Sequence, residues 1–597
     1  MAAPSLVEKC IEAATASAEA VERWRRLRRT LERLPSHLAD QLLACLITRK
    51  LAFPSLLDYV YFSAISCCRV FQHSVEVINL SGQNMVDGEW LAYLGAFRCL
   101  QSLKLADCRG VSSSSIWPLA GMDALKELDL SRCQKFTDVG VKHIITIESL
   151  EKLYLCQTGV TASGVMLLSS LSNLSVLDLG GIFVTDKALS SLQVLKNLEH
   201  LELWGSKISD AGATILKAFP RLGYLSLLWT SVTTIPVLPS IKTLNMSNCT
   251  INSIFNGPCP SHGVPLSKLI LSGSKFENAE KALSGIDLNF VTSLDLSGSL
   301  LNNFDFLETM ENLEHLNLSF CGIGDTTLET IANNGNSLRY LDLKKTKVTS
   351  HGVSFLAGTV PKLEYLSLAN TMIDDSALSY ISMMPSLQTL DLSYTSIKGY
   401  MYNGNYQVKV PSACSLTSLN HLESLNLEGI QLKDEAIKPL SKLRNLKYLN
   451  LRSEYLSDSS FLTLASISGL KYLGYQGAVL TDSGFLSYVP HEDLKKLDLR
   501  DCWLLTQEAI SLFCKRYPNI ALDHELVFQV NSKTTHFQNQ VKQRRAKKEE
   551  PRGASKVPFA DERIRYAIEE LMQLQIVGEP CSDINLSHIP PELKRTD

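Results

Sequence analysis

Large apolar residues return at fixed spacing along most of the chain. The frame L-x-x-L-x-L recurs between Val75 and Leu499, for example over residues 125–130 and 338–343. Apolar and polar positions alternate within each frame, which predicts a short strand with its leucines buried. The frames recur with a mean period of about 24.6 residues, their first positions falling at residues 75, 100, 125, 150, 174, 198, 222, 241, 266, 291, 313, 338, 363, 387, 422, 446, 470 and 494.

Between the frames, a capping residue followed by an apolar run predicts a helix in most repeats. Examples are residues 137–141, 185–189, 209–212 and 481–484. One strand and one helix cannot bury their apolar side chains alone, so neighbouring repeats are expected to stack. The pattern resembles the cysteine-containing and ribonuclease-inhibitor-like leucine-rich repeats. This resemblance implies an α/β repeat solenoid over residues 75–525, a horseshoe with a parallel concave sheet and a mostly helical convex side.

Two irregularities interrupt the ladder of repeats. The interval between the frames at 387 and 422 is longer, and its extra residues 398–406, which include Tyr402, are rich in tyrosine, asparagine and glycine. We expect them to form an exposed loop that folds over the concave rim and contacts a partner. The alternative is a tolerated surface insertion. The repeat from 222 to 241 is shorter, which is expected to change the curvature locally.

The third and fifth frame positions are expected to face the concave side, because the leucines between them face the core. A cluster of aromatic residues there predicts an anchoring patch for a protein partner, since interfaces enrich tryptophan and tyrosine. The alternative is that these rings are ordinary ladder residues. The candidates at the third position are His200, Tyr224, Tyr340, Tyr365, Tyr448 and Tyr472. Trp204 and Trp229 lie just past the strands and complete the patch around His200 and Tyr224, and Tyr402 lies in the inserted segment.

Residues 1–74 precede the repeats and are expected to form a helical module. Residues 5–14 match the Elongin C box, a pattern in which an apolar stripe carries leucine, cysteine and a small or aliphatic residue at four-residue steps. In proteins with this motif, the helix inserts into a groove on Elongin C. The resemblance implies that Leu6, Cys10 and Ala14 contact the adaptor.

Residues 34–42 match the cullin box in order and separation from the first motif. A helical module followed by leucine-rich repeats resembles the zygote-defective eleven family, the substrate receptors of cullin-RING ubiquitin ligases. The resemblance implies a cullin contact through Leu34, Pro35, Leu38 and Leu42, with the concave face binding the substrate protein.

Three other interpretations are open. Residues 34–43 also resemble the opening of an F-box, which would recruit Skp1 instead of Elongin C. The N-terminal helices would equally serve as a cap in an interaction scaffold unrelated to ubiquitin, because solenoids need capped ends. The fold would also suit an inhibitor that docks an enzyme in its concavity.

Composition narrows the class of protein. A net charge of −3 and a sequence pI near 6.5 argue against a dedicated nucleic-acid binder. The sequence has no apolar stretch long enough for a membrane span and no secretory leader at its start, which predicts a cytoplasmic protein. Ninth-position cysteines are expected in the core, in a reducing compartment: Cys108, Cys133, Cys249, Cys321 and Cys502.

No chemistry-bearing motif accompanies the repeats. The sequence has no phosphate-binding glycine loop, no metal-ligand cluster and no nucleophile elbow. We therefore expect neither an enzyme nor a cofactor. After residue 525, a polar linker carries a basic run at 542–548, a candidate nuclear signal, and residues 561–575 have the pattern of an amphipathic helix.

Overall fold

The computed structural model describes residues 6–17, 20–21, 35–49, 74–257, 264–283, 285–301, 303–403 and 408–526. The chain divides into two units, Met1–Val527 and Phe528–Asp597, and every described residue belongs to the first. Leu34, the basic run and the expected helix over residues 561–575 lie outside the described residues.

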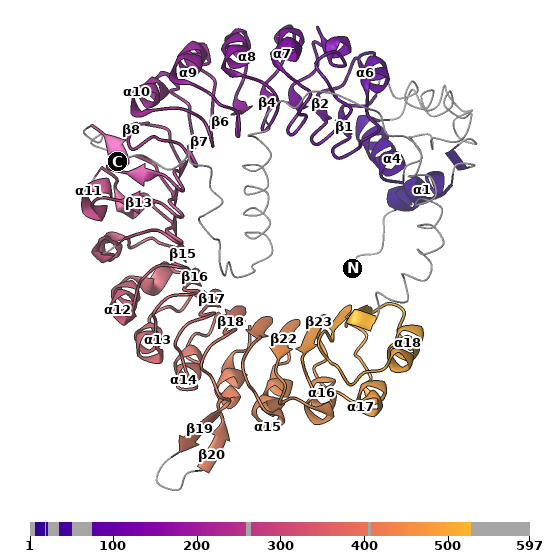
Figure 1. Ribbon diagram of the computed structural model, residues 1–597, viewed down its shortest axis with the longest axis vertical. Coiled ribbons are helices and arrows are strands. Elements are labelled where there is room, and N and C mark those ends of the chain that lie inside the picture. Colours follow the sequence, from indigo (N-terminus) through magenta and orange to yellow (C-terminus); the bar gives the residue numbers. More distant parts are fainter. Residues whose placement is uncertain are drawn as a thin grey trace, which may run out of the picture. The chain divides into compact units, whose positions relative to one another are not determined.

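A 19-stranded sheet runs through the first unit, and all pairs of neighbouring strands in it are parallel. Its strands lie on the inner side of the curve and the helices that follow the first strand lie on the outer side (Figure 1), so the predicted α/β repeat solenoid is confirmed. The strands are β1 (Val77–Asn79), β2 (Ser102–Lys104), β3 (Glu127–Asp129), β4 (Lys152–Tyr154), β5 (Val176–Asp178), β6 (His200–Glu202), β7 (Tyr224–Ser226), β9 (Thr243–Asn245), β12 (Lys268–Ile270), β14 (Ser293–Asp295), β15 (His315–Asn317), β16 (Tyr340–Asp342), β17 (Tyr365–Ser367), β18 (Thr389–Asp391), β21 (Ser424–Leu427), β22 (Tyr448–Arg452), β23 (Tyr472–Gln476), β24 (Lys496–Asp498) and β25 (Ala521–Asp523).

The register follows the leucine frame. Leu103 pairs with Leu128 and Leu128 with Leu153, so fourth-position leucines stack from repeat to repeat. All three are fully buried. An offset of one residue would turn these leucines toward solvent, so the hydrophobic pattern itself fixes the register.

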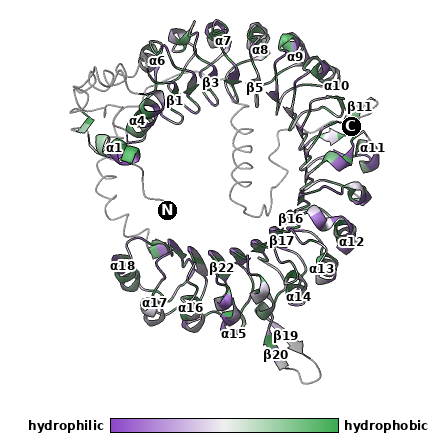
Figure 2. Ribbon diagram, turned by 180° about the vertical axis from the view of Figure 1, so that it is seen from behind, coloured by the Kyte–Doolittle hydropathy of each residue, from purple (hydrophilic) through white to green (hydrophobic). Residues whose placement is uncertain are grey.

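Short helices return the chain along the outer side. They show mixed hydrophobic and hydrophilic residues, as expected for helices with one buried face (Figure 2). The α-helices are α1 (Leu6–Ala14), α4 (Ser36–Thr48), α6 (Gly88–Leu94), α7 (Asp138–Ile144), α8 (Ala162–Leu167), α9 (Asp186–Ser191), α10 (Asp210–Ala213), α11 (Ala279–Leu283), α12 (Asp325–Asn333), α13 (Ser350–Leu356), α14 (Ala377–Ile381), α15 (Asp434–Ile437), α16 (Asp458–Leu464), α17 (Asp482–Ser487) and α18 (Gln507–Arg516). The 3-10 helices are η1 (Trp117–Leu119), η2 (Leu168–Ser170), η3 (Leu192–Val194), η4 (Thr214–Ala218), η5 (Leu288–Phe290), η6 (Asp305–Thr309), η7 (Gly335–Ser337), η9 (Ser412–Ser418) and η10 (Lys438–Lys442).

The shortened repeat lacks room for a helix. It holds the two-residue strand β8 (Ile235–Pro236) instead, which pairs with β11 (Phe255–Asn256) of the next repeat. In that next repeat β10 (Thr250–Ile251) pairs with β13 (Lys275–Phe276) of the repeat after it. An extended segment covers a given distance with fewer residues than a helix does.

The helix starts are joined to one another by aspartates. Asp186 in α9 accepts hydrogen bonds from the backbone N–H of Ser209 (2.9 Å) and from its hydroxyl (2.6 Å) in the next repeat. Asp210 does the same for Thr233. A Cβ added at Gly212 would lie 2.0 Å from Asp186 Oδ1, which explains the glycine in the Ser-Asp-x-Gly pattern. Thr185 and Thr481 cap their helices as predicted, whereas the side chains of Thr137 and Ser209 do not.

Replacing Asp186 with alanine tests this ladder. The substitution leaves the N–H and hydroxyl of Ser209 without their partner, so we expect the free energy of unfolding to fall by about 1–3 kcal/mol. Urea unfolding measures the change, and hydrogen exchange at residues 209–212 locates it. Lys187→Ala, an exposed change in the same helix, is the control. Equal stability of the two variants would contradict the role of the ladder.

The ninth-position cysteines bond the neighbouring repeat. The Cys108 thiol donates to the Leu80 carbonyl (3.1 Å) and the Cys133 thiol to the Leu105 carbonyl (3.1 Å). Burial raises the pKa of Cys108 to about 11 and that of Cys133 to about 12, so both stay protonated donors. All five of these cysteines are buried and free, as the sequence predicts.

The last described strand of the sheet, β25, lies beyond the last leucine frame and is not predicted from the sequence. β25 pairs with β24 and buries Leu522 at the fourth position, but Asn519 and His524 stand at the first and sixth positions. His524 is buried, with its Nε2 3.3 Å from the Cys502 carbonyl oxygen. A polar residue thus replaces a frame leucine where the stack ends.

The long interval between β18 and β21 forms a hairpin rather than a loop. β19 (Tyr400–Asn403) pairs antiparallel with β20 (Val408–Pro411), and Tyr402 lies opposite Lys409. The Tyr400 hydroxyl donates to Glu435 of α15 (3.2 Å), and the hairpin projects from the outer side (Figure 1). The expectation that this segment covers the concave rim is therefore wrong, because its base packs on a convex helix.

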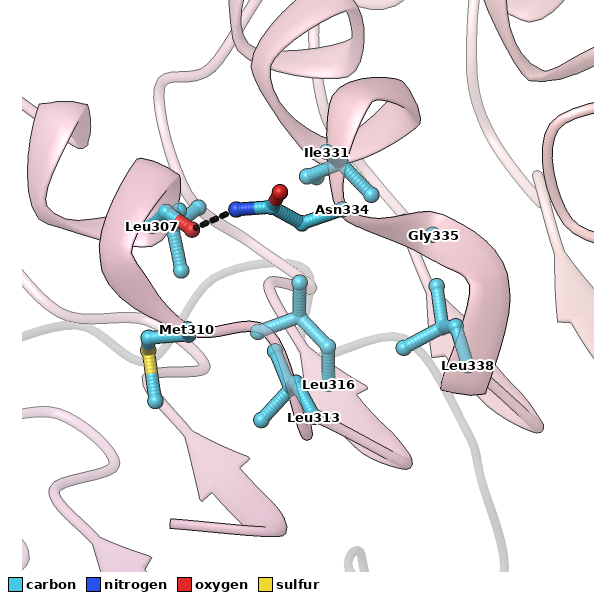
Figure 3. A pocket seen from close by; sticks show the side chains of 8 residues that line it. All are labelled: Leu307, Met310, Leu313, Leu316, Ile331, Asn334, Gly335 and Leu338. Carbon is cyan, nitrogen blue, oxygen red and sulfur yellow. Dashed lines mark hydrogen bonds between the residues drawn. The ribbon is translucent and has the colours of Figure 1, made fainter. Parts of the chain in front are cut away.

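A small apolar gap lies between η6 and α12 (Figure 3). Leucine side chains such as Leu313, Leu316 and Leu338 line it, and the Asn334 amide donates to the Leu307 carbonyl (3.3 Å). The Asn334 amide is thus bonded to the backbone, and the other side chains that line the gap are apolar. We interpret it as a packing gap of the core.

Candidate protein-binding surfaces

The concave face displays the third and fifth frame positions, as predicted. In β3, β5 and β6 the central leucine is buried while the residues on both sides of it are partly exposed. Neighbouring strands lie about 4.8 Å apart. Side chains at equivalent positions therefore form continuous rows across the repeats.

A repeated turn explains the aspartates and asparagines at the fifth position. Asp129 Oδ1 accepts the N–H of Ser131 (2.9 Å), and Asn245 Oδ1 accepts the N–H of Ser247 (3.0 Å). Each side chain thus closes an Asx turn two residues ahead. The same turn recurs at Asn79, Asp178, Asp295, Asn317, Asp342, Asp391, Asn426 and Asp498.

The predicted anchoring patch is centred on a stacked pair of rings. His200 of β6 and Tyr224 of β7 are parallel, with ring centroids 3.9 Å apart. His200 Nε2 lies 3.7 Å from a carboxylate oxygen of Glu202, and both residues are partly exposed. Burial and the carboxylates of Glu202 and Asp178 raise the pKa of Tyr224, so its hydroxyl remains protonated.

The two tryptophans of this patch differ in burial. Trp204 is only 8% exposed, and a Cβ added at Gly180 would lie 1.9 Å from its indole Nε1. Its ring therefore packs over Gly180 and supports the face, which corrects its prediction as a partner anchor. Trp229 is half-buried at the turn after β7, with a φ of 57°. That left-handed conformation usually favours glycine.

Carboxylates gather beside the ring pair. Asp129, Asp178 and Glu202 occupy fifth positions on β3, β5 and β6, and Tyr154 stands between the first two. Burial, together with the charges of Glu202 and Asp129, raises the pKa of Asp178 from 3.8 to about 6.

A second row of rings lies on β15–β17. Tyr340 and Tyr365 stack with centroids 4.2 Å apart, and His315 lies 6.1 Å from Tyr340. Burial and the charge of Asp342 raise the pKa of Tyr340 to about 12. The structure therefore brings two of the predicted aromatic residues, Tyr340 and Tyr365, together and adds His315 beside them.

A third group lies on β22–β24, where Tyr472 and Asp498 are paired and Tyr448 is exposed. Tyr448 is 47% exposed, and the Tyr472 hydroxyl lies 3.4 Å from Asp498 Oδ2. Asp498 is almost fully buried and accepts from Arg500 Nε (2.9 Å) and Nη2 (2.7 Å). These hydrogen bonds from Arg500 lower the pKa of Asp498 despite its burial, so the negative charge there is already neutralised.

Helix α1 presents two of its predicted adaptor residues to solvent. Leu6 is 79% exposed and Cys10 is exposed, whereas Ala14 is half-buried and packs against the core. Arg49, the residue after α4, holds α1 in place, since its Nη1 donates to the carbonyls of Thr15 (2.9 Å) and Glu12 (3.3 Å).

Helix α4 closes the first strand of the solenoid. Asp40 Oδ1 accepts the backbone N–H groups of Glu76 (3.0 Å) and Val77 (3.1 Å). Leu42 is buried in the core, Leu38 is half-buried and Pro35 is exposed. Leu42 therefore has no free surface for the cullin contact that the sequence predicts, because it packs within this cap.

The described residues contain neither a candidate metal site nor a helix that could cross a membrane. No group of three or more His, Cys, Asp or Glu side chains in that part of the chain is placed to hold a metal ion. Among the same residues, no helix is both long and apolar enough to cross a membrane.

Comparisons with known proteins agree with the repeat pattern. The family model described as Leucine Rich repeat matches residues 125–144 and 309–332. These stretches fall within the parallel, in-register sheet and its helices, so the matches agree with a leucine-rich-repeat fold. No curated protein matches the sequence.

Solved structures show similar chains at low identity. A leucine-rich-repeat protein of Leptospira interrogans is 20% identical, with a TM-score of 0.44, over 75% of this chain and 95% of that chain. An internalin of Listeria monocytogenes is 20% identical, with a TM-score of 0.39, over 66% and 97%. A plant peptide hormone receptor, solved in complex with a peptide, is 14% identical, with a TM-score of 0.37, over 77% and 88%.

Proposed function

We propose that this leucine-rich-repeat protein is a non-catalytic interaction subunit that recognises substrates for a cullin-RING ubiquitin ligase. Helix α1 binds the adaptor Elongin C, and the concave face binds the target protein. The ubiquitin-transfer chemistry belongs to other subunits, so this chain needs no cofactor. The free, buried thiols suit the reducing cytoplasm or nucleus in which such a ligase works.

The exposure of Leu6 and Cys10 carries this proposal. They lie four residues apart, and therefore on one face of α1. Ala14 continues this face by one more step of four, but it is half-buried and packs against the core, as Ile11 does. Apolar side chains exposed side by side on one helix face support a role in binding a partner.

Capping of the solenoid does not account for these two residues. Asp40 satisfies the first strand, and Ala39, Leu42, Leu43 and Leu46 of α4 cover its apolar end. The same burial weighs against the F-box interpretation, because that motif would need the apolar residues of α4 for Skp1.

The test compares the double variant Leu6→Ala/Cys10→Ala with Lys9→Ala, an exposed change in the same helix. Binding of the full chain to purified Elongin B–Elongin C and to Skp1 is measured by calorimetry. Two buried interface anchors are together worth several kcal/mol, so we expect the double variant to bind Elongin C at least about 100-fold more weakly, with Lys9→Ala unchanged.

The other outcomes separate the alternatives. Binding to Skp1 that survives in both variants would favour the F-box interpretation. Binding to neither adaptor would leave an interaction scaffold. The circular dichroism melting curve of the double variant should match that of the parent chain, since Leu6 and Cys10 bury little surface.

A further inference from the structure

Four fifth-position residues form a lane on the concave face. Asp129, Tyr154, Asp178 and Glu202 pair in register across β3, β4, β5 and β6. The stacked rings of His200 and Tyr224 border its far end. The lane crosses three strand spacings, about 14 Å, which matches about four residues of an extended peptide.

In the part of the chain that the structure describes, no lysine or arginine forms an ion pair with the carboxylates of this lane, and their nearest basic group is the His200 ring, 3.7 Å from Glu202. Two nearby lysines interact with Glu127, which lies outside the lane. Lys104 forms an ion pair with it (3.2 Å), and the charge of Lys152 lowers its pKa. The charges that act on Asp178 are those of Glu202 and Asp129, which oppose its ionisation, and of His200, which favours it. At the other end of the face, Arg500 neutralises Asp498. Asp498 therefore has a guanidinium partner within the protein, whereas Asp129, Asp178 and Glu202 are left able to bind a cation from another molecule.

The fold does not require a charge at these positions. Asn79, Asn245, Asn317 and Asn426 close the same turn with a neutral amide. Asparagine at position 178 would therefore serve the backbone equally well and would avoid repulsion from Glu202. A residue that breaks a local rule without structural need points to function.

We propose that this lane, from Asp129 to Glu202, binds an extended arginine-containing segment of the target protein. This rests on the concave face being the target-binding surface of the proposed function. A guanidinium donates to carboxylates in a fixed fork and stacks on aromatic faces, and the lane offers both kinds of group. The negative charge also excludes acidic segments.

The test measures fluorescence anisotropy of the full chain with three labelled ten-residue peptides. They carry arginine, lysine or glutamate at alternate positions, with glycine and serine between. The variant Asp178→Asn/Glu202→Gln removes two charges from the lane. The matched control, Asp295→Asn/Asp391→Asn, removes two charges elsewhere on the face at positions that make the same turn.

We expect the arginine peptide to bind the parent chain and to lose at least 10-fold in affinity with the lane variant, but less than 2-fold with the control. Binding should weaken as salt is added. Equal losses in both variants, no binding of the arginine peptide, or equal binding of the lysine peptide would overturn the proposal. Elongin C affinity, measured on the same variants, should not change. Failure of the adaptor test would thus be distinguishable from failure of the lane.

Discussion

Replacing Asp375 with alanine is expected to lower the free energy of unfolding by about 3–5 kcal/mol. The carboxylate is only 8% exposed and accepts three hydrogen bonds. The donors are the backbone N–H groups of Lys398 (2.8 Å) and Gly399 (2.8 Å) and the hydroxyl of the buried Ser412 (2.6 Å). Alanine leaves all three donors without partners at the base of the β19–β20 hairpin.

Urea unfolding and hydrogen exchange over residues 398–412 measure this effect. Lys398→Ala is the control, because it removes an exposed side chain and keeps the N–H that Asp375 binds. We expect faster exchange in the Asp375 variant throughout the hairpin base. The hairpin would not depend on this carboxylate if the two variants unfolded at the same urea concentration.

Asp178→Asn is expected to stabilise the protein at neutral pH, by up to about 3 kcal/mol. The folded pKa of Asp178 is raised from 3.8 to about 6, so the folded state binds its proton more tightly than the unfolded state. The contribution of this group to stability is present below about pH 4 and is lost as the pH rises to about 6. Asparagine removes that loss and keeps the Asx turn.

The variant and the parent chain should therefore unfold alike at pH 3.5 and differ most at pH 7.5. Urea unfolding at both values checks this, with hydrogen exchange at residues 176–180 as a local measure that suits a repeat protein. Asp391→Asn, which preserves the same kind of turn, is the control. Equal stability of Asp178→Asn and the parent at pH 7.5 would contradict the view that the charge of Asp178 lowers the free energy of unfolding.

The sheet could be predicted from the sequence because one physical rule repeats in every turn of the solenoid. Each fourth-position leucine needs a neighbour above and below it, so the spacing of Leu103, Leu128 and Leu153 fixes both strand and register. The ninth-position thiols follow from the same frame. The strand at Leu522 could not be predicted in this way, because Asn519 and His524 replace the apolar residues at the first and sixth frame positions.

The binding surfaces could be predicted only in part. The frame places His200, Tyr224, Tyr340 and Tyr365 on the concave face, but it carries no information on how deeply a ring sits. Trp204 is buried because residue 180 in the preceding repeat is glycine, a relation between two repeats rather than within one. The aspartates joining helix starts left a signal in the recurring Ser-Asp and Thr-Asp pairs.

The Asx turns along the concave face have a consequence for how such a protein changes its target. Aspartate and asparagine are interchangeable as turn formers here, and one nucleotide change converts one codon into the other. The charge profile of the face can therefore drift repeat by repeat while the core stays untouched. Selection for a new partner would act on a row of independent positions, each adjustable without repacking its neighbours.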